Sequence, residues 1–299
     1  MNRVDQTAFR IHTDPVFFRE AIGFTAAQTG FSQRLIEKDY FCSLLLARLV
    51  SDEASNLVFK GGTCLAKVHS RFYRMSEDLD FVIPVATDCN RSERRRRIAD
   101  FKAHFATITK LEPHFAVKEP LKGANESRQY LGSVSYPSQV QVKDETVKIE
   151  VALREPLLTA AAEGSARTAL LDPISAQPLQ PSVPIRCISL IEAFAEKFRA
   201  ALTRREVAIR DFYDIDFGVR ELSILPDDTD LVHLVGQKIA VPGNGPIDVS
   251  SARIRALENQ LDSRLRPVLR QMDFDAFDKD RAVELVTQMA ALLQPTPDS

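Results

Sequence analysis

The segment that most constrains the fold is a short apolar strand that leads into a pair of glycines. Residues 57–59 predict a buried strand, Gly61 and Gly62 a turn, and residues 63–71 a helix. A strand that ends in glycines and leads into a helix places free backbone N–H groups beside the positive end of that helix. The segment therefore indicates a place where a phosphate group can approach the backbone, with Thr63 as the helix cap or as a hydroxyl donor.

A second strand, predicted over residues 78–83, begins with two aspartates. Asp78 and Asp80 are two residues apart, so both carboxylates point to one side of the strand. Carboxylates together with substrate phosphates are ligands that Mg²⁺ prefers, with Mn²⁺ as the alternative. Alone, a glycine pair is usually a turn, and two alternating aspartates are usually a solvated strand end. Their ordered combination is much rarer and favours metal-assisted nucleotide chemistry.

A third carboxylate, Glu150, lies in a strand predicted over residues 147–151. We expect this strand to be the second arm of a β-hairpin over residues 131–153, with the first arm around residues 140–142 and the turn at residues 143–145. Glu150 shares one face with a lysine two residues earlier, so one interpretation is an exposed alternating strand. The other is a carboxylate beside the aspartate strand that holds a second metal ion or accepts a proton from a nucleophile.

A segment with four prolines, residues 172–184, separates two predicted domains. Residues 1–184 form the N-terminal domain, with an αβ core, and residues 185–299 form a helical C-terminal domain. The fold class is therefore α+β, with a small mixed sheet flanked by helices. The helices expected in the N-terminal domain, apart from the one after the glycines, cover residues 15–29, 33–50 and 91–111, the last of them basic.

The C-terminal domain begins with a strong helix signal. Ser189 and Glu192 have the spacing of a capping box, in which each side chain satisfies the free backbone N–H of the other residue. Further helices are expected over residues 207–222, 228–238, about 254–269 and 281–293.

Two charged positions on these helices are candidate site residues. Lys197 lies off the apolar stripe of its helix and could reach a triphosphate as a point charge, although a solvated helix face is the simpler interpretation. Asp211 and Asp214 are three residues apart and therefore share a helix face. They could instead be carboxylates that complement the positive end of the helix dipole.

Charge and composition exclude several classes of protein. The formal net charge is −2, from 39 basic and 41 acidic residues, which excludes a protein that coats nucleic acid non-specifically. Two local segments are basic: residues 91–102, and residues 197–210, where five basic side chains stand against one acidic one. These segments could contact the phosphates of a nucleic acid.

The cysteines and the hydropathy pattern point to the cytoplasm. The four cysteines form no Cys-x-x-Cys pair and no sequence cluster with histidine, so neither a zinc site nor a disulfide framework is expected. Residues 1–14 contain no apolar core of signal-peptide length. No stretch approaches the ~20 apolar residues of a membrane span, so no membrane association is expected.

Five short elements, in the right order, together resemble one family: the AbiEii/AbiGii-type toxins of bacterial toxin–antitoxin and phage-defence systems, which are nucleotidyltransferase-like proteins of the DNA polymerase β type. The matching segments are Glu37-Lys-Asp-Tyr40, Lys60-Gly-Gly-Thr63 with Leu65 and Lys67, Arg74-x-Ser-Glu-Asp-Leu-Asp-Phe81, Ser189 to Lys197 with Arg204 or Arg205, and Arg210-Asp-Phe-Tyr-Asp-Ile215.

The resemblance implies a polymerase β-like fold and assigns roles to particular residues. Lys60, Gly61, Gly62 and Thr63 would bind the β- and γ-phosphates of an NTP. The metal ligands would be Asp78 and Asp80, with Glu150 in the place of a third carboxylate, although the motif around Glu150 is loose. The triphosphate would also contact Lys197, and Asp211 would complete the site as a partner of Lys197 or of the acceptor.

The implied function is a metal-dependent nucleotidyltransferase toxin. It would transfer NMP from an NTP to an RNA acceptor, with the tRNA 3′ end as the expected target, and would have a possible cognate antitoxin as partner. Two alternatives remain open. One is a GTP- or NTP-binding regulatory module without turnover, and the other is an enzyme that transfers NMP to a protein hydroxyl.

Overall fold

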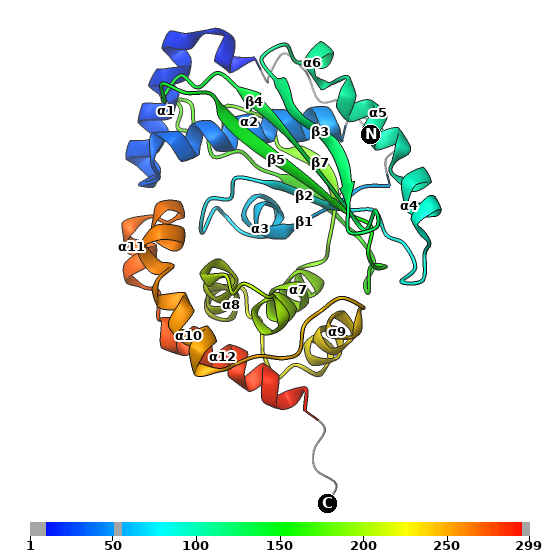
Figure 1. The fold of residues 1–299 in the computed structure, drawn as a ribbon. Helices are drawn as coiled ribbons and strands as arrows, with labels where there is room; N and C mark the ends of the chain where they lie inside the picture. Colours follow the sequence, from blue (N-terminus) through cyan, green and yellow to red (C-terminus); the bar gives the residue numbers. More distant parts are fainter. Residues whose placement is uncertain (1–9, 51–55, 295–299) are drawn as a thin grey trace, which may run out of the picture. The chain divides into compact units, whose positions relative to one another are not determined.

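Seven strands form one mixed sheet in the computed structural model, which describes residues 10–50 and 56–294 (Figure 1). The strand order across the sheet is β3-β4-β5-β2-β1-β7-β6. The strands are β1 (Val58–Lys60), β2 (Leu79–Val82), β3 (Ala116–Ala124), β4 (Gln129–Tyr136), β5 (Glu145–Ala152), β6 (Ala162–Ala166) and β7 (Val183–Cys187).

The chain divides into two compact units. The first unit comprises residues 1–157 and 161–188 and contains the sheet, whereas the second comprises residues 158–160 and 189–299 and is helical. The mixed sheet flanked by helices, followed by a helical part, confirms the predicted fold class. Within the described residues, no helix is both long enough and apolar enough to cross a membrane.

The central strands of the sheet carry an apolar face. Strand β2 pairs antiparallel with β1 and parallel with β5, and β1 pairs parallel with β7. Phe59 and Phe81 are register partners on β1 and β2, and each is at most 1% exposed. Lys60 and Asp80, which are also register partners, lie on the opposite face of these strands.

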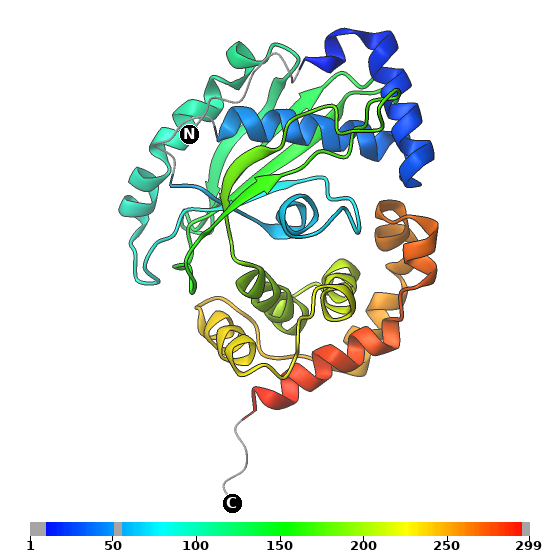
Figure 2. The same cartoon turned by 180° about the vertical axis from the view of Figure 1, so that it is seen from behind.

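Helices of the first unit surround the sheet. Helix α2 contacts β5 and β7, so it crosses the strands between them, and α1 packs alongside α2 (Figure 2). Strand β3 is covered by α5 and α6. The helical segments are a 3₁₀ turn (Ile11–Thr13), α1 (Pro15–Thr29), α2 (Gln33–Leu49), α3 (Gly61–Cys64), the π-helical turn η3 (Leu65–His69), α4 (Arg91–Arg97), α5 (Ala99–Ala106) and α6 (Ile108–Leu111).

Helix α1 has the bounds that its local signals predict. The Asp14 carboxylate accepts hydrogen bonds from the backbone N–H groups of Val16 and Phe17, and Pro15 occupies the first turn. Gly30 ends the helix with φ of +79°, a left-handed conformation that favours glycine. The helix predicted over residues 91–111 is instead three short helices.

The predicted hairpin over residues 131–153 is wrong in its first arm. Strand β4 pairs with β5 but ends at Tyr136, and residues 137–144 form the connection. Pro137 explains the end of the strand because proline has no N–H for the ladder. Val142, expected on the first arm, is fully exposed.

Strands β3, β6 and β7 were not predicted. Strand β7 lies at the end of the proline-rich segment, and Pro184 at its second position faces Ser165 on β6. The burial of Val183, Ile185 and Cys187 alternates with their neighbours, which is the strand signal that the prolines obscured.

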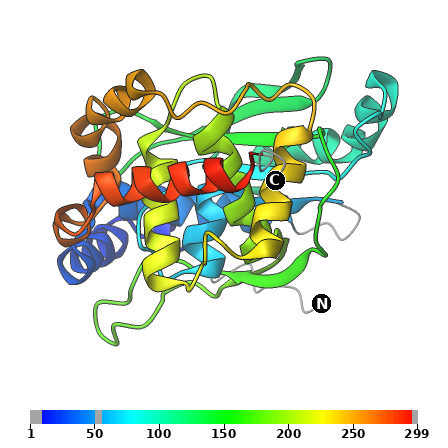
Figure 3. The ribbon, with the colours of Figure 1, turned by 90° about the horizontal axis from the view of Figure 1, so that it is seen from below.

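The second unit is built around α7. This helix packs against α8 and α9, and α12 crosses α7 and α8 (Figure 3). Gly218 on α8 lies against the Phe194 ring on α7, where a Cβ atom would overlap the ring. The helices are α7 (Leu190–Thr203), α8 (Ile209–Glu221), α9 (Thr229–Ala240), α10 (Ser251–Glu258), the turns η4 (Leu261–Leu265) and η5 (Arg266–Val268), α11 (Gln271–Asp275) and α12 (Lys279–Leu292).

Only half of the predicted capping box forms at α7. The Ser189 hydroxyl accepts the backbone N–H of Glu192 at 3.2 Å, as expected. The Glu192 carboxylate does not return to Ser189. It accepts the backbone N–H groups of Leu158 and Thr159, and it pairs with Lys238 at 2.7 Å. The segment Leu158–Ala160 is thereby tied to the start of α7.

Candidate active site

The glycine pair brings the backbone close to two charged side chains. Gly61 has φ of +77°, and a Cβ atom there would overlap the carboxylate of Asp80. A Cβ atom on Gly62 would overlap the guanidinium of Arg74. Gly61 requires glycine because of its positive φ and its contact with Asp80, whereas a side chain at Gly62 would require the Arg74 guanidinium to move.

Helix α3 begins at the glycine pair, where the sequence predicted a turn. Its N-terminal residue is Gly61, and the helical path continues through η3 to His69. The Thr63 side chain does not cap the helix; its hydroxyl donates to the backbone carbonyl of Asp78. Thr63 thus ties the start of the helix to the aspartate strand.

Three of the predicted site residues lie side by side across the sheet. Lys60 on β1 is the register partner of Asp80 on β2, and Asp80 is the partner of Glu150 on β5. Register partners on adjacent strands point to the same face with Cβ atoms about 5 Å apart. We call these three residues the site row. Asp78, two residues before Asp80, extends the row's face and is exposed, whereas Asp80 and Glu150 are half-buried.

Arg74 is a residue of this site that the prediction named only as part of a motif. Its side chain is 2% exposed, lies against Gly62, and donates from Nη1 to the backbone carbonyl of Met75 at 3.1 Å. A buried guanidinium beside a glycine turn adds positive charge where a phosphate would approach. Its place in the motif with Asp78 and Asp80 was the available signal.

The charged residues of the Glu37-Lys-Asp-Tyr40 element are part of the fold rather than of this site. Glu37 is fully buried and accepts hydrogen bonds from the Ser138 hydroxyl and the Gln139 backbone N–H, which anchor the loop after β4. Burial raises the pKa of Glu37, although these two hydrogen bonds oppose the increase. The next residue, Lys38, pairs with Glu145 at 3.1 Å.

Asp39 and Lys67 form a buried ion pair. The Lys67 ammonium contacts Asp39 Oδ1 at 2.5 Å and donates to the Ser43 hydroxyl at 2.7 Å, and its side chain is fully buried. The other carboxylate oxygen of Asp39 accepts the backbone N–H of Ala169 at 2.9 Å. Together with Glu37 and Lys38, these residues form what we call the buried charge network.

In the second unit, Lys197 lies between two aspartates. Its Nζ atom is 2.9 Å from Asp211 Oδ1 and 2.7 Å from Asp214 Oδ2. Arg204 binds the other oxygen of Asp211 at 2.8 Å. The Lys197 side chain is 13% exposed, so the interpretation as a solvated helix face is wrong. The aspartates of α8 face a lysine on α7 instead of serving only the helix dipole.

The charges around Asp211 fix its ionisation. Burial raises its pKa, but the positive charges of Lys197 and Arg204 outweigh burial, so the pKa lies below the ordinary value of 3.8. Asp211 is therefore a carboxylate at neutral pH, and it holds Lys197 in one orientation.

The predicted site residues thus form two groups. The first unit brings together Lys60, Gly61, Gly62, Thr63, Asp78, Asp80 and Glu150. The second unit brings together Lys197 and Asp211.

The chemistry of the first group fits a hard divalent cation. Asp78, Asp80 and Glu150 offer carboxylate oxygens on one face of adjacent strands, which is the donor type that Mg²⁺ and Mn²⁺ favour. Two groups other than these carboxylates have three potential ligand atoms that all lie within 4.8 Å of one another in the described residues, a spacing that the three carboxylates do not have. They are His12, Glu112 and His114, and Cys64, His69 and Cys187.

The second of these groups corrects the expectation that cysteine and histidine do not cluster. Cys64 and His69 lie on one short helical segment, and Cys187 is next to Phe59 because β7 pairs with β1. The sequence separation between residues 64 and 187 hid this neighbourhood.

Solved structures to which the chain is similar include MenT4, a nucleotidyltransferase toxin from Mycobacterium tuberculosis H37Rv. It is 18% identical, with a TM-score of 0.49, over 92% of this chain and 99% of that chain. JHP933 from Helicobacter pylori is 15% identical, with a TM-score of 0.44, over 87% of this chain and 88% of that chain. No curated protein sequence matches the chain.

One family profile matches most of the chain. It is described as "Nucleotidyl transferase AbiEii toxin, Type IV TA system" and covers residues 44–289. The match includes the glycine turn, the site row and the Lys197 helix. The chain belongs to the AbiEii family of nucleotidyltransferase toxins.

Proposed function

We propose that this protein transfers NMP from an NTP to the 3′ hydroxyl of an RNA, with tRNA as the acceptor, in a reaction that depends on Mg²⁺ or Mn²⁺. The observation that carries the proposal is the site row, which sets Asp80 and Glu150 next to each other on the sheet, while Asp80 also lies against Gly61 of the glycine pair. Family membership supports the transfer of nucleotidyl groups and implies a cognate antitoxin.

The residues of the site row and of the glycine pair have different roles in the proposed reaction. The backbone of the glycine turn, together with Lys60 and Arg74, binds the β- and γ-phosphates and orients the α-phosphorus. Asp78, Asp80 and Glu150 would hold the divalent cations, which supply charge stabilisation to the attacking and leaving oxygens when bound.

The reaction balances with the groups present. The acceptor 3′ oxygen forms a bond to the α-phosphorus, the bond from that phosphorus to the α–β bridging oxygen breaks, and pyrophosphate leaves. The hydroxyl proton passes to a carboxylate of the row, for which Glu150 is our assignment because it is half-buried at the end of the row. We assign Lys197 to the triphosphate, with Asp211 as the residue that positions it.

An arginine-rich groove in the second unit favours RNA over protein as the acceptor. The groove has a volume of about 820 Å³ and lies where the α7–α8 connection meets α10 and η4. Arg205 and Arg264 are exposed there, whereas Arg253 uses its guanidinium to bind the carbonyls of Ala201 and Arg204. Clustered exposed arginines are typical of surfaces that contact nucleic-acid phosphates.

The test is a transfer assay with the full chain, α-labelled NTPs, Mg²⁺ and total tRNA. We expect label on RNA, and we expect Asp80→Asn to reduce transfer by roughly 10³-fold, because removal of one carboxylate charge weakens stabilisation of the transferred phosphoryl group. Asp88→Asn, a change at an exposed turn, is the matched control. Label on protein would identify a protein NMP-transferase instead, and saturable NTP binding without transfer would identify a regulatory module.

The groove is tested separately by RNA affinity. Arg205→Ala and Arg264→Ala should each weaken RNA binding. Each should also reduce the slope of log affinity against log salt concentration by about one, as expected for the loss of one phosphate contact. Arg186→Ala, at an exposed position on β7 in the first unit, should leave both unchanged. Unaltered RNA affinity in both groove variants would argue against the groove as the acceptor surface.

A further inference from the structure

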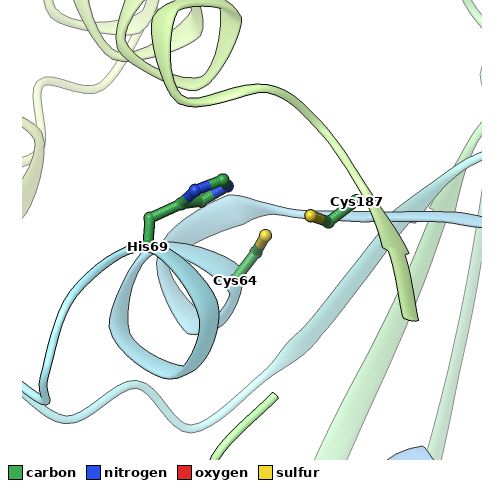
Figure 4. A group of neighbouring side chains, drawn as sticks. All are labelled: Cys64, His69 and Cys187. Atoms are coloured by element: carbon green, nitrogen blue, oxygen red, sulfur yellow. The ribbon is translucent and has the colours of Figure 1, made fainter. Parts of the chain in front are cut away.

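The thiol–imidazole cluster of Cys64, His69 and Cys187 is outside the proposed reaction. The three residues end α3, η3 and β7, and their side chains converge (Figure 4). One potential ligand atom from each lies within 4.8 Å of those of the other two. Both cysteines are fully buried, and His69 is half-buried. We propose that these three residues bind one zinc ion.

The orientation of His69 matches that of a metal ligand. Its Nε2 atom lies 2.9 Å from the backbone carbonyl oxygen of Ile188. A carbonyl oxygen can only accept, so Nε2 carries the proton and Nδ1 carries the lone pair. Histidines that bind metals usually donate their second ring N–H to a carbonyl or carboxylate, which fixes the tautomer and the ring orientation. His69 therefore offers Nδ1 as its ligand atom.

Cys64 and Cys187 each offer one sulfur atom to the cluster, and both side chains are fully buried. The thiolate is the metal ligand. Gly164 on β6 keeps space beside the sulfur, because a Cβ atom there would lie 2.9 Å from Cys187 Sγ.

Ligand chemistry and charge both select zinc rather than the cation of the site row. Two thiolates and one imidazole are soft or borderline ligands, which suit Zn²⁺ and not Mg²⁺. Two thiolate charges neutralise one Zn²⁺, so the complex places no net charge in the buried site. Three protein ligands leave a fourth coordination position for water.

The position of the cluster gives the ion a structural consequence. Cys64 follows Thr63 directly at the end of the helix that starts with the glycine pair, and Cys187 is the register partner of Phe59 on β1. Bound zinc would join the helix after the glycine turn to the strand next to β1. This proposal does not depend on the proposed function, because binding is measured without turnover.

The experiment measures zinc binding by the reduced, tag-free full chain. Metal content by mass spectrometry and titration against a chromogenic chelator should give one zinc per chain. Cys64→Ser and Cys187→Ser should each weaken zinc binding by about 100-fold or more, which exceeds the loss expected for a supporting residue. Cys89→Ser, a buried cysteine that donates to the Asn90 carbonyl, is the matched control and should bind like the wild type.

Two further measurements keep the proposal falsifiable if a variant does not fold. Excess zinc should raise the Tm of the wild type by about 5 °C. Cobalt in place of zinc should give thiolate-to-metal charge-transfer absorption in the wild type and in Cys89→Ser, but not in the double variant Cys64→Ser/Cys187→Ser. The proposal is overturned if the reduced wild type binds no zinc, or if the double variant Cys64→Ser/Cys187→Ser binds zinc with the affinity of the wild type. It is also overturned if the cluster forms a Cys64–Cys187 disulfide and binds no metal.

Discussion

The buried charge network and the site row both consist of charged residues from the motifs of the same sheet-containing unit, yet their surroundings differ. In the network, Asp39 and Lys67 are at most 3% exposed and satisfy each other within the fold. In the row, Asp80 and Glu150 are half-buried on the face beside the glycine turn. The contrast teaches that a charged residue of a motif stabilises the fold when a residue of opposite charge is buried with it. Where two carboxylates are neighbours, as Asp80 and Glu150 are, an ion or a substrate is the expected partner.

The Lys197 cluster has features of both regions. Lys197 is largely buried and paired with Asp211 and Asp214, as in the network, but it belongs to the group that the family resemblance assigns to the triphosphate. Substitutions in the three places should therefore separate effects on stability from effects on transfer.

The largest effect is expected in the network. Lys67→Met removes the ammonium and leaves the Asp39 carboxylate buried, with a hydrogen bond from the Ala169 N–H but without the opposite charge. Breaking a buried pair in this way costs about 3–5 kcal/mol, which corresponds to a decrease in Tm of roughly 10 °C. Calorimetry measures the decrease, with Lys102→Met at an exposed position as control. A Tm equal to that of the control would show that the Asp39–Lys67 pair does not stabilise the fold.

The next effect is expected in the row. Glu150→Gln keeps the size of the side chain but removes the charge that holds a cation or accepts a proton, so nucleotidyl transfer should fall about 100-fold. The Tm should change by less than about 2 °C, because no buried pair is broken. Lys148→Gln, on the same face of β5, is the control. If Glu150→Gln lowered the Tm and left transfer intact, Glu150 would belong with the network.

The Lys197 cluster is tested through pH. Asp211→Asn weakens the pairs with Lys197 and Arg204 and should destabilise the protein by about 2 kcal/mol at pH 7. Because the folded pKa of Asp211 is lowered, its contribution is complete above the unfolded value of 3.8 and is lost as the pH falls through the folded value. The difference between wild type and variant should therefore be constant from pH 7 to about 5 and shrink below about 4.

Unfolding in urea at a series of pH values measures this difference, with Asp227→Asn at an exposed loop as control. A difference that grows at low pH would contradict the lowered pKa. A parallel loss of kcat/KM for the NTP would assign the cluster to the site as well as to the fold.

The smallest effect is expected at a helix cap. Ser189→Ala removes the hydroxyl that accepts the Glu192 N–H and should cost about 1 kcal/mol. Ser92→Ala, exposed in the first turn of α4, should cost little, and thermal unfolding compares the two. Equal costs would mean that the Glu192 contacts alone hold the start of α7.

The elements that the sequence predicts well are those with local signals. Asp14, Pro15 and Gly30 define α1 because caps act within a few residues. The aspartate strand is likewise local, whereas the glycine pair, predicted as a turn, is the first turn of α3. Strand β3 was missed because most of its side chains are exposed, so its apolar alternation is weak. The first arm of the hairpin was misplaced because Val140 and Val142 alternate as in a strand, although the strand ends at Tyr136, before Pro137.

The arrangement of the candidate site depends on pairings that no local pattern contains. That Glu150 lies beside Asp80 follows from the parallel pairing of β5 with β2, across about 70 intervening residues. The side-by-side spacing of Asp211 and Asp214 on α8 was readable from helix geometry, but their contact with Lys197 requires the packing of α8 on α7. Cys187 reaches Cys64 for the same reason, through β7 beside β1.

The contacts of Glu192 have a consequence for how this chain can be cut or recombined. Residues 158–160 leave the sheet-containing part of the chain for three residues, give two N–H donors to Glu192, and return to form β6. A gene fragment that starts at the α7 helix would lack these donors and leave the carboxylate with the Lys238 pair. An exchange of the helical unit between relatives should therefore include residues 158–160, because they donate two hydrogen bonds to Glu192.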